Sequence, residues 1–207
     1  MAHCCNEDDA HIARLRERQA HMLWLVLGLN AALFVIEFSA GWLAGSSALL
    51  ADSLDMLGDS LVYGLSLFVV ARSARWKAVS AGFKGSLMLL FGVIVLAEAA
   101  FKAISGQPPQ PAVMAGVGLL ALSANLLCLL LLTRHRDDDV NMRSSWVCSR
   151  NDLLANGGVL LAAMLVAATG RVWPDVVIGL LIAGVFVHSA IGVLQDARSS
   201  LHPAAPH

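Results

Sequence analysis

The chain has 207 residues, of which 57% are hydrophobic and 14% are charged, and its mean hydropathy is +0.70. This composition excludes an ordinary soluble domain and is typical of a membrane protein with several spans. The net charge of −1 identifies no partner, and we expect no nucleic-acid partner.

The first 20 residues are polar and carry arginines instead of the short apolar core of a cleavable signal. We therefore expect residues 1–20 to form an uncleaved cytoplasmic tail. Four residues of this tail could capture a soft metal, although a merely disordered polar tail is the alternative. They are His3, Cys4, Cys5 and His11.

Six apolar runs follow, each long enough to cross ~30 Å of hydrocarbon as a helix of roughly 20 residues. They predict an all-α polytopic membrane protein whose transmembrane domain covers residues 21–198, with a short C-terminal tail over 199–207. The predicted spans are approximately 22–43, 47–71, 80–104, 112–133, 144–169 and 174–195.

Basic residues gather on one side of these spans, which predicts that side to be cytoplasmic. An even number of spans then places both termini in the cytoplasm. Because no organelle signal is evident, we expect a bacterial inner membrane. The residues on the cytoplasmic side are Arg14, Arg16, Arg18, Arg72, Arg75, Lys77, Lys84, Arg134, Arg136, Arg143 and Arg198, whereas Lys102 and Arg171 fall on the other side.

Carboxylates inside the spans are the main functional signal, because ionisable groups are costly in a membrane and usually face a bundle interior. Asp52, Asp55 and Asp59 share one face of the second span. Such a stripe requires a positive partner. Glu37 and Glu98, each taken alone, are as compatible with a functional role as with a structural one, in which the carboxylate is protonated or salt-bridged.

The fifth span begins with a second polar group. Cys148 and Asp152 are four residues apart and share a face flanked by Asn151 and Asn156. Two helices thus each present two ligand-type groups, and carboxylates with a thiolate suit tetrahedral Zn²⁺ or Cd²⁺ better than Mg²⁺. Because four negative charges are expensive in a low-dielectric interior, some empty-site ligands should hold protons that the metal expels.

Two stretches resemble the cation diffusion facilitator family of zinc and other divalent-metal exporters. "NAALFVIEFSAGWLAGSSALLADSLDMLGDS" is similar to the family's first and second spans, with an Asn, a Glu and then a [HD]-x-x-x-D pair. "MRSSWVCSRNDLLANGGVLL" is similar to its fifth span, which carries the second pair. The resemblance covers roughly residues 20–198.

The resemblance implies that Asp55, Asp59, Cys148 and Asp152 bind the transported metal, with export from the cytosol against protons by a homodimer. No prosthetic group is implied. Cys148 stands where the family more often has His or Asp. A cysteine ligand favours soft metals; the alternative is that Cys148 is a small buried residue and an aspartate binds the metal. The chain stops where the family usually adds a cytoplasmic metal-sensing and dimerisation domain, which puts the dimer in doubt.

Other polar residues are candidates for the ligand surroundings or the ion pathway. They are Asp52, Asn151 and Asn156, together with Asn30 and Glu37 of the first span. Two other functions stay open. One is a membrane metal sensor or accessory protein that binds the metal without transporting it. The other is an intramembrane aspartyl protease, because "MLGDS" faintly resembles the catalytic Gly-Asp motif of such enzymes.

Overall fold

The computed structural model describes residues 2–69, 74–133 and 140–201. Within these ranges, side chains are described from His21 onward, apart from residues 22–23, 62–63, 65–78, 132, 140–151, 196 and 199–201.

Six helices make up the described chain, which contains no strand, and this confirms the predicted all-α fold. The second and fourth begin and end within about two residues of the predicted spans, whereas the first, third, fifth and sixth continue beyond them. The helices are α1 (Ala2–Ala44), α2 (Ser47–Val69), α3 (Ala74–Ser105), α4 (Pro111–Thr133), α5 (Val140–Thr169) and α6 (Trp173–Leu201).

All described helices except α2 contain a segment long and apolar enough to cross a membrane. α2 has 23 residues, or about 34 Å at 1.5 Å per residue, which is long enough to cross as well. Its three aspartates lower its apolar character, and they are the residues that marked it as functional. The chain is therefore a multi-pass membrane protein.

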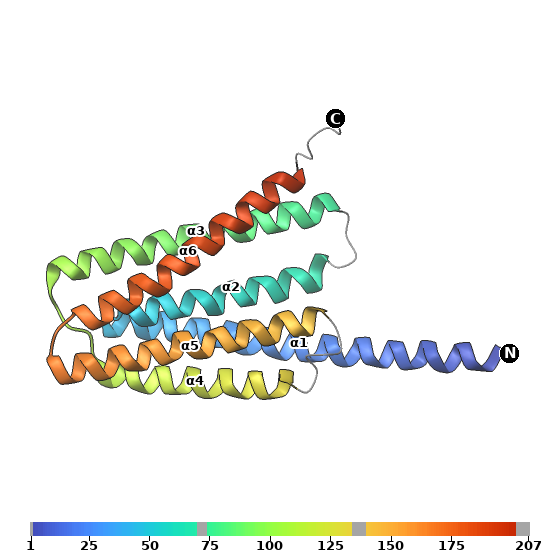
Figure 1. Cartoon of the computed structure of the whole chain (residues 1–207), viewed down its shortest axis with the longest axis horizontal. Coiled ribbons are helices and arrows are strands. Elements are labelled where there is room, and N and C mark those ends of the chain that lie inside the picture. Colours follow the sequence, from blue (N-terminus) through green and yellow to red (C-terminus); the bar gives the residue numbers. More distant parts are fainter. Residues whose placement is uncertain (1, 70–73, 134–139, 202–207) are drawn as a thin grey trace.

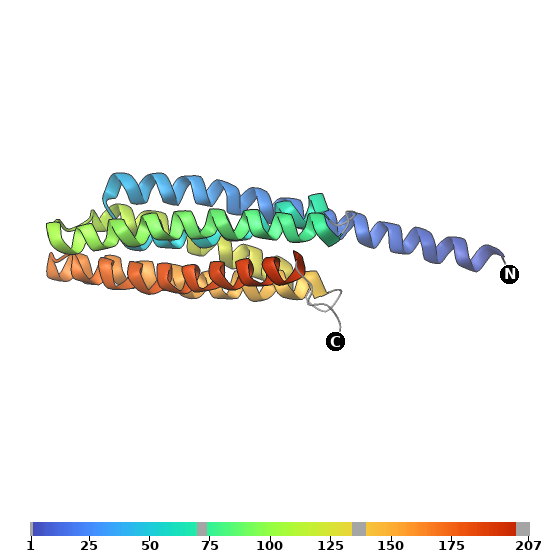
Figure 2. The same ribbon diagram turned by 90° about the horizontal axis from the view of Figure 1, so that it is seen from above.

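The six helices run roughly along one common axis (Figures 1 and 2). The start of α1 projects beyond the bundle, at the same end as the last residues of α6. The most extensive contacts join α3 to α6, α4 to α5 and α1 to α2. α2 also contacts α3, α5 and α6, so the helix with the aspartates is the most enclosed of the six.

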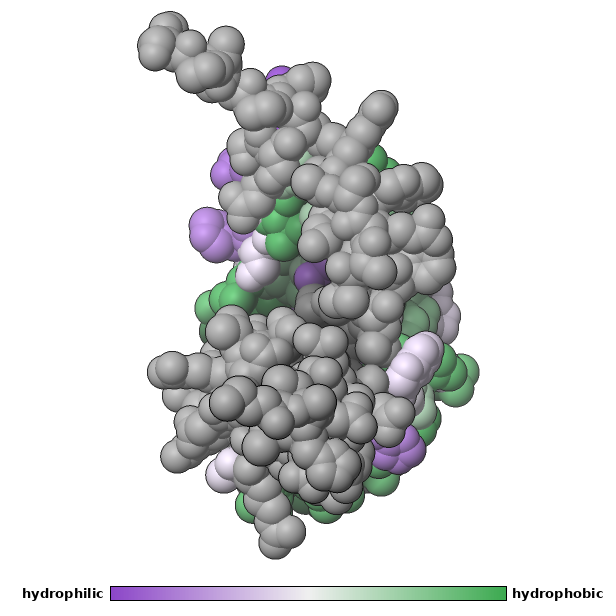
Figure 3. Space-filling model, turned by 90° about the vertical axis from the view of Figure 1, so that its right-hand side faces the viewer, coloured by the Kyte–Doolittle hydropathy of each residue, from purple (hydrophilic) through white to green (hydrophobic). Residues whose placement is uncertain are grey.

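The outside of the bundle is apolar. Large hydrophobic side chains such as Leu43, Phe101 and Leu154 are exposed on different helices. Viewed from the end at which α1 begins, described hydrophobic residues appear around the periphery (Figure 3). Exposed apolar side chains on every side are unfavourable in water and suit contact with lipid.

α1 and α2 are joined by a tight turn. Gly45 has φ +64°, and the Ser46 N–H donates to the Gly41 carbonyl at 2.8 Å, which together satisfy the end of α1. The Ser46 hydroxyl accepts the Leu49 N–H at 3.1 Å and thereby caps the start of α2. Gly41 also lets α2 approach closely, because a Cβ there would lie 3.0 Å from the Leu50 backbone nitrogen.

Candidate functional site

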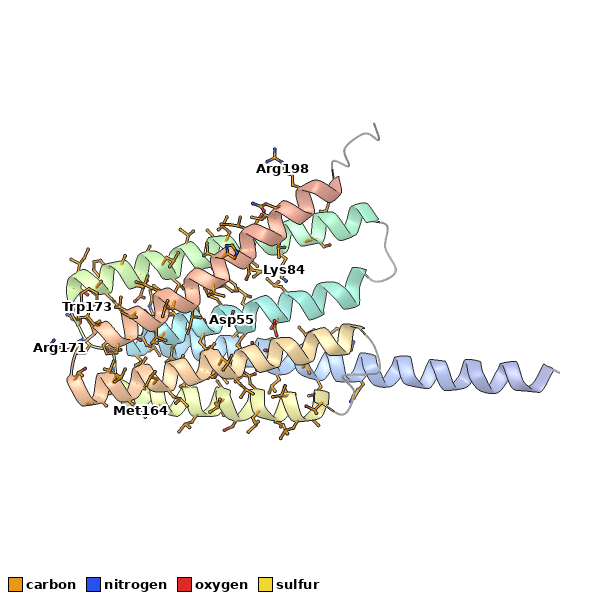
Figure 4. The ribbon with its side chains drawn as sticks, viewed as in Figure 1. Asp55, Lys84, Met164, Arg171, Trp173 and Arg198 are labelled. Carbon is orange, nitrogen blue, oxygen red and sulfur yellow. The ribbon has the colours of Figure 1, made fainter. Side chains whose placement is uncertain are left out.

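A cavity of about 620 Å³ lies among α2, α3, α5 and α6. Asp55 and Asp59 of α2 line it together with Asp152 of α5. Figure 4 shows Asp55 within the bundle, in the part of α2 that neighbours α5 and α6. The structure thus brings together three of the four predicted metal ligands, from two helices that are far apart in sequence.

Helix geometry explains this convergence. Asp55 and Asp59 are one turn apart and share a face of α2. α5 packs against α2, which places Asp152 opposite this face, and only 5% of Asp152 is exposed. Carboxylates from two helices thus line one cavity, and a metal site would need both helices.

The fourth predicted ligand, Cys148, lies on α5 one turn before Asp152. Its side chain is outside the described set, as are those of Asn151 and of the tail residues His3, Cys4, Cys5 and His11. Among the described side chains, no three His, Cys, Asp or Glu groups are close enough to hold a metal ion together. The complete ligand set therefore stays a prediction.

A second layer of acid groups lies beside this cavity. Asp52 and Glu37 are fully buried, and none of their four carboxylate oxygens has a hydrogen-bond partner among the described residues. Asp52 interacts electrostatically with Glu37, Asp55 and Asp152, so these acids form one cluster. Buried carboxylates without a partner are tolerated only when a proton or another cation neutralises them.

Two of the predicted asparagines are also buried in the bundle. The Asn156 side-chain amide donates to the Asp152 carbonyl at 2.8 Å, and that of Asn30 donates to the Val26 carbonyl at 2.9 Å. Both leave their side-chain oxygens without a partner among the described residues. Each asparagine thus places an acceptor oxygen in the bundle interior.

Lys84 of α3 also lines the cavity, whereas its place in the sequence indicated only the cytoplasmic side of the membrane. Met88, four residues later on the same face of α3, is buried and lines the same cavity. This packing, which no local sequence pattern shows, places that face of α3 in the bundle interior.

Asp175, in the first turn of α6, was missed as well. Its carboxylate accepts the Ser46 hydroxyl at 2.6 Å, the Ser47 N–H at 2.7 Å and the Ala48 N–H at 3.1 Å. It therefore satisfies free donors at the start of α2. No local pattern could reveal this, since the partners are more than 120 residues away.

Glu98 is ion-paired, which favours the structural alternative for this residue. Its carboxylate lies 2.7 Å from the Lys102 ammonium and accepts the Ser47 hydroxyl at 2.9 Å. Glu98 of α3 and Asp175 of α6 thus both contact the start of α2. This end supports the fold and lies away from the acid-lined cavity.

The family model described as "Cation efflux transmembrane domain" matches residues 23–202 of the chain. The chain is 26% identical to "Zinc transporter ZitB" of Escherichia coli (strain K12), over 100% of this chain and 69% of that protein. It is 27% identical to the "Cadmium, cobalt and zinc/H(+)-K(+) antiporter" of Bacillus subtilis (strain 168), over 83% and 60%. It is 25% identical to "Metal cation efflux system protein CzcD" of Cupriavidus metallidurans, over 77% and 54%.

These matches cover the part that crosses the membrane. The chain spans roughly half to two thirds of the length of these relatives.

Proposed function

Because the chain belongs to the cation efflux family, whose members are transporters and not enzymes, we propose that it exports Zn²⁺ or Cd²⁺ from the cytosol in exchange for protons. The observation that carries this proposal is the convergence of Asp55, Asp59 and Asp152 on one cavity inside a membrane protein. Cys148 completes the ligand set. The cytoplasmic membrane of a bacterium is the proposed location.

The metal suits the donors. Three carboxylates and a thiolate match tetrahedral Zn²⁺ or Cd²⁺, and the sulfur favours soft ions over Mg²⁺. The names of the relatives agree, since they mention zinc, cadmium and cobalt. The metal is the cargo and no prosthetic group is proposed.

Proton exchange follows from electrostatics. Five carboxylates, those of Asp55, Asp59, Asp152, Asp52 and Glu37, belong to one cluster, in which the last three are buried and the first two are partly buried. They repel one another when ionised, so protons must neutralise several of them while the cavity is empty. A dication that enters replaces those protons. The name of the B. subtilis relative includes H(+) and K(+) as counter-ions.

The proposal assigns Asp52, Glu37, Asn30 and Asn156 to the ion pathway, because they have buried side-chain oxygens without a partner in the described part of the chain. The proposal also assigns Asn151 to the surroundings of the ligands. It assigns the capture of a soft metal before transport to the tail residues His3, Cys4, Cys5 and His11. A homodimer and cytoplasmic termini are also part of the proposal.

The test is zinc and cadmium uptake into everted membrane vesicles under an imposed proton gradient. Wild type should accumulate both metals, and Asp59→Ala and Asp152→Ala should abolish the accumulation. Cys148→Ser should change the preference between the metals. Tight zinc binding that needs the same residues, without any uptake by wild type, would overturn export and identify a sensor or accessory protein.

A further inference from the structure

Lys84 brings a positive charge to the cavity that Asp55, Asp59 and Asp152 line. The rest of the described lining is apolar apart from Ser189, so Lys84 is the one cation among the described residues that line it. Figure 4 shows Lys84 on α3, on the side of that helix that faces α2. Lys84 is half-buried, and its location on the cavity wall is not explained by anchoring at a membrane surface alone.

The backbone of α3 packs closely against α6 beside Lys84. A Cβ at Gly85 would lie 2.8 Å from a side-chain carbon of Leu194, so α3 and α6 are in direct contact there. A lysine ammonium is a compact charge on a flexible four-carbon stem. It can therefore approach the carboxylates or withdraw while α3 keeps its position.

We propose that Lys84 is a tethered counter-cation. Its ammonium lies near the cavity carboxylates when no metal is bound, and it moves away from them when the metal enters. The proposal rests on the proposed function and adds a residue that sets metal affinity. The positive charge of Lys84 lowers the affinity of the cavity for a divalent cation, and it neutralises part of the carboxylate charge after the metal has left.

This property suits a transporter, which must release its cargo. Binding that is too tight gives a stable complex and slow turnover, because release then limits the cycle. A lysine that competes with the metal shortens the time for which the metal stays bound. Arginine in this place would keep the charge, whereas glutamine and methionine would remove it with a side chain of similar length.

The experiment measures zinc affinity of the purified full chain by calorimetry, with Lys84→Gln and Lys84→Met as the test variants. We expect both to bind zinc at least threefold more tightly than wild type, and to show a lower KM with a lower kcat in proteoliposomes. Lys84→Arg should bind within twofold of wild type. Lys102→Gln, a matched change at the Glu98 ion pair outside this cavity, should leave zinc affinity unchanged.

Equal or weaker zinc binding by both Lys84→Gln and Lys84→Met would overturn the counter-cation role and would leave the proposed export intact. A lysine with only a structural role would give that result, together with a lower melting temperature. If wild type itself binds no zinc, the proposed function fails, and the counter-cation role fails with it. The measurement therefore separates the two failures.

Discussion

The carboxylate of Asp175 on α6 accepts the backbone N–H of Ser47, the first residue of α2, at 2.7 Å. A helix begins with free N–H donors and a partial positive charge, and both favour a carboxylate at this position. Here the carboxylate comes from another helix, so the same contact fixes α2 relative to α6. Because α2 carries Asp55 and Asp59, the contact helps to position the candidate metal site.

Asp175→Asn should destabilise the folded protein by roughly 1–3 kcal/mol, because an amide replaces the charged acceptor of three hydrogen bonds. Thermal unfolding in detergent would measure this change. Ser46→Ala removes the hydroxyl donor and the cap on Leu49, and leaves the two backbone donors to Asp175 in place. Ser46→Ala should therefore lower the stability less than Asp175→Asn does. An Asp175→Asn protein as stable as wild type would contradict the role given to this carboxylate.

Gly179→Ala should push α6 away from α2. A Cβ at this position would lie 2.7 Å from the Ser47 carbonyl carbon and 2.8 Å from its oxygen, and backbone atoms cannot move aside easily. We expect a loss of about 1–3 kcal/mol and reduced zinc uptake. Gly184→Ala on the same helix is the matched control, since nothing lies within 4 Å of its Cβ position, and it should be neutral.

Asp52→Asn should leave the folding stability unchanged or raise it, although Asp52 is fully buried. Its carboxylate has no hydrogen-bond partner among the described residues and lies near other acids, so a neutral amide of similar shape removes a repulsive group. The melting temperature of Asp52→Asn should thus exceed that of Asp175→Asn. The reverse order would show that Asp52 makes a stabilising contact in the folded protein.

Cys148→Ser should weaken cadmium binding more than zinc binding. A hydroxyl is a harder and poorer ligand than a thiolate, and cadmium is the softer of the two ions. Competition between the two metals for the purified protein would measure the ratio of affinities. An unchanged ratio would indicate that Asp152 and the α2 aspartates bind the metal without the sulfur.

The fold was predictable because the membrane imposes a length on each apolar segment. The predicted spans over 47–71 and 112–133 correspond closely to α2 and α4. The predicted first span over 22–43 agrees with the apolar segment Trp24–Ala44. α1 itself begins earlier, because polar residues can continue a helix after it leaves the apolar region.

The acids of the site were predictable for a related reason. Three aspartates on one face of an apolar helix have a high cost in lipid, so their positions carry information about function. In the structure, Asp55, Asp59 and Asp152 line one cavity. It did not test whether Cys148 joins them.

Asp175 and Lys84 could not be assigned from the sequence for a different reason. A carboxylate in the first turn of a helix is normally explained by its own helix, and a lysine near a span end by the membrane surface. Their observed positions depend on which helices pack together, which is α6 on α2 for Asp175 and α3 on α6 for Lys84. Local patterns do not contain that information.

The central claim is that the acid-lined cavity exchanges a metal ion for protons. The most direct test follows zinc uptake and internal pH together in proteoliposomes that contain a pH-sensitive dye. Wild type should take up zinc while the internal pH rises, and both signals should disappear in Asp59→Ala and Asp152→Ala. Zinc uptake without any pH change, or uptake that persists in both variants, would contradict the claim.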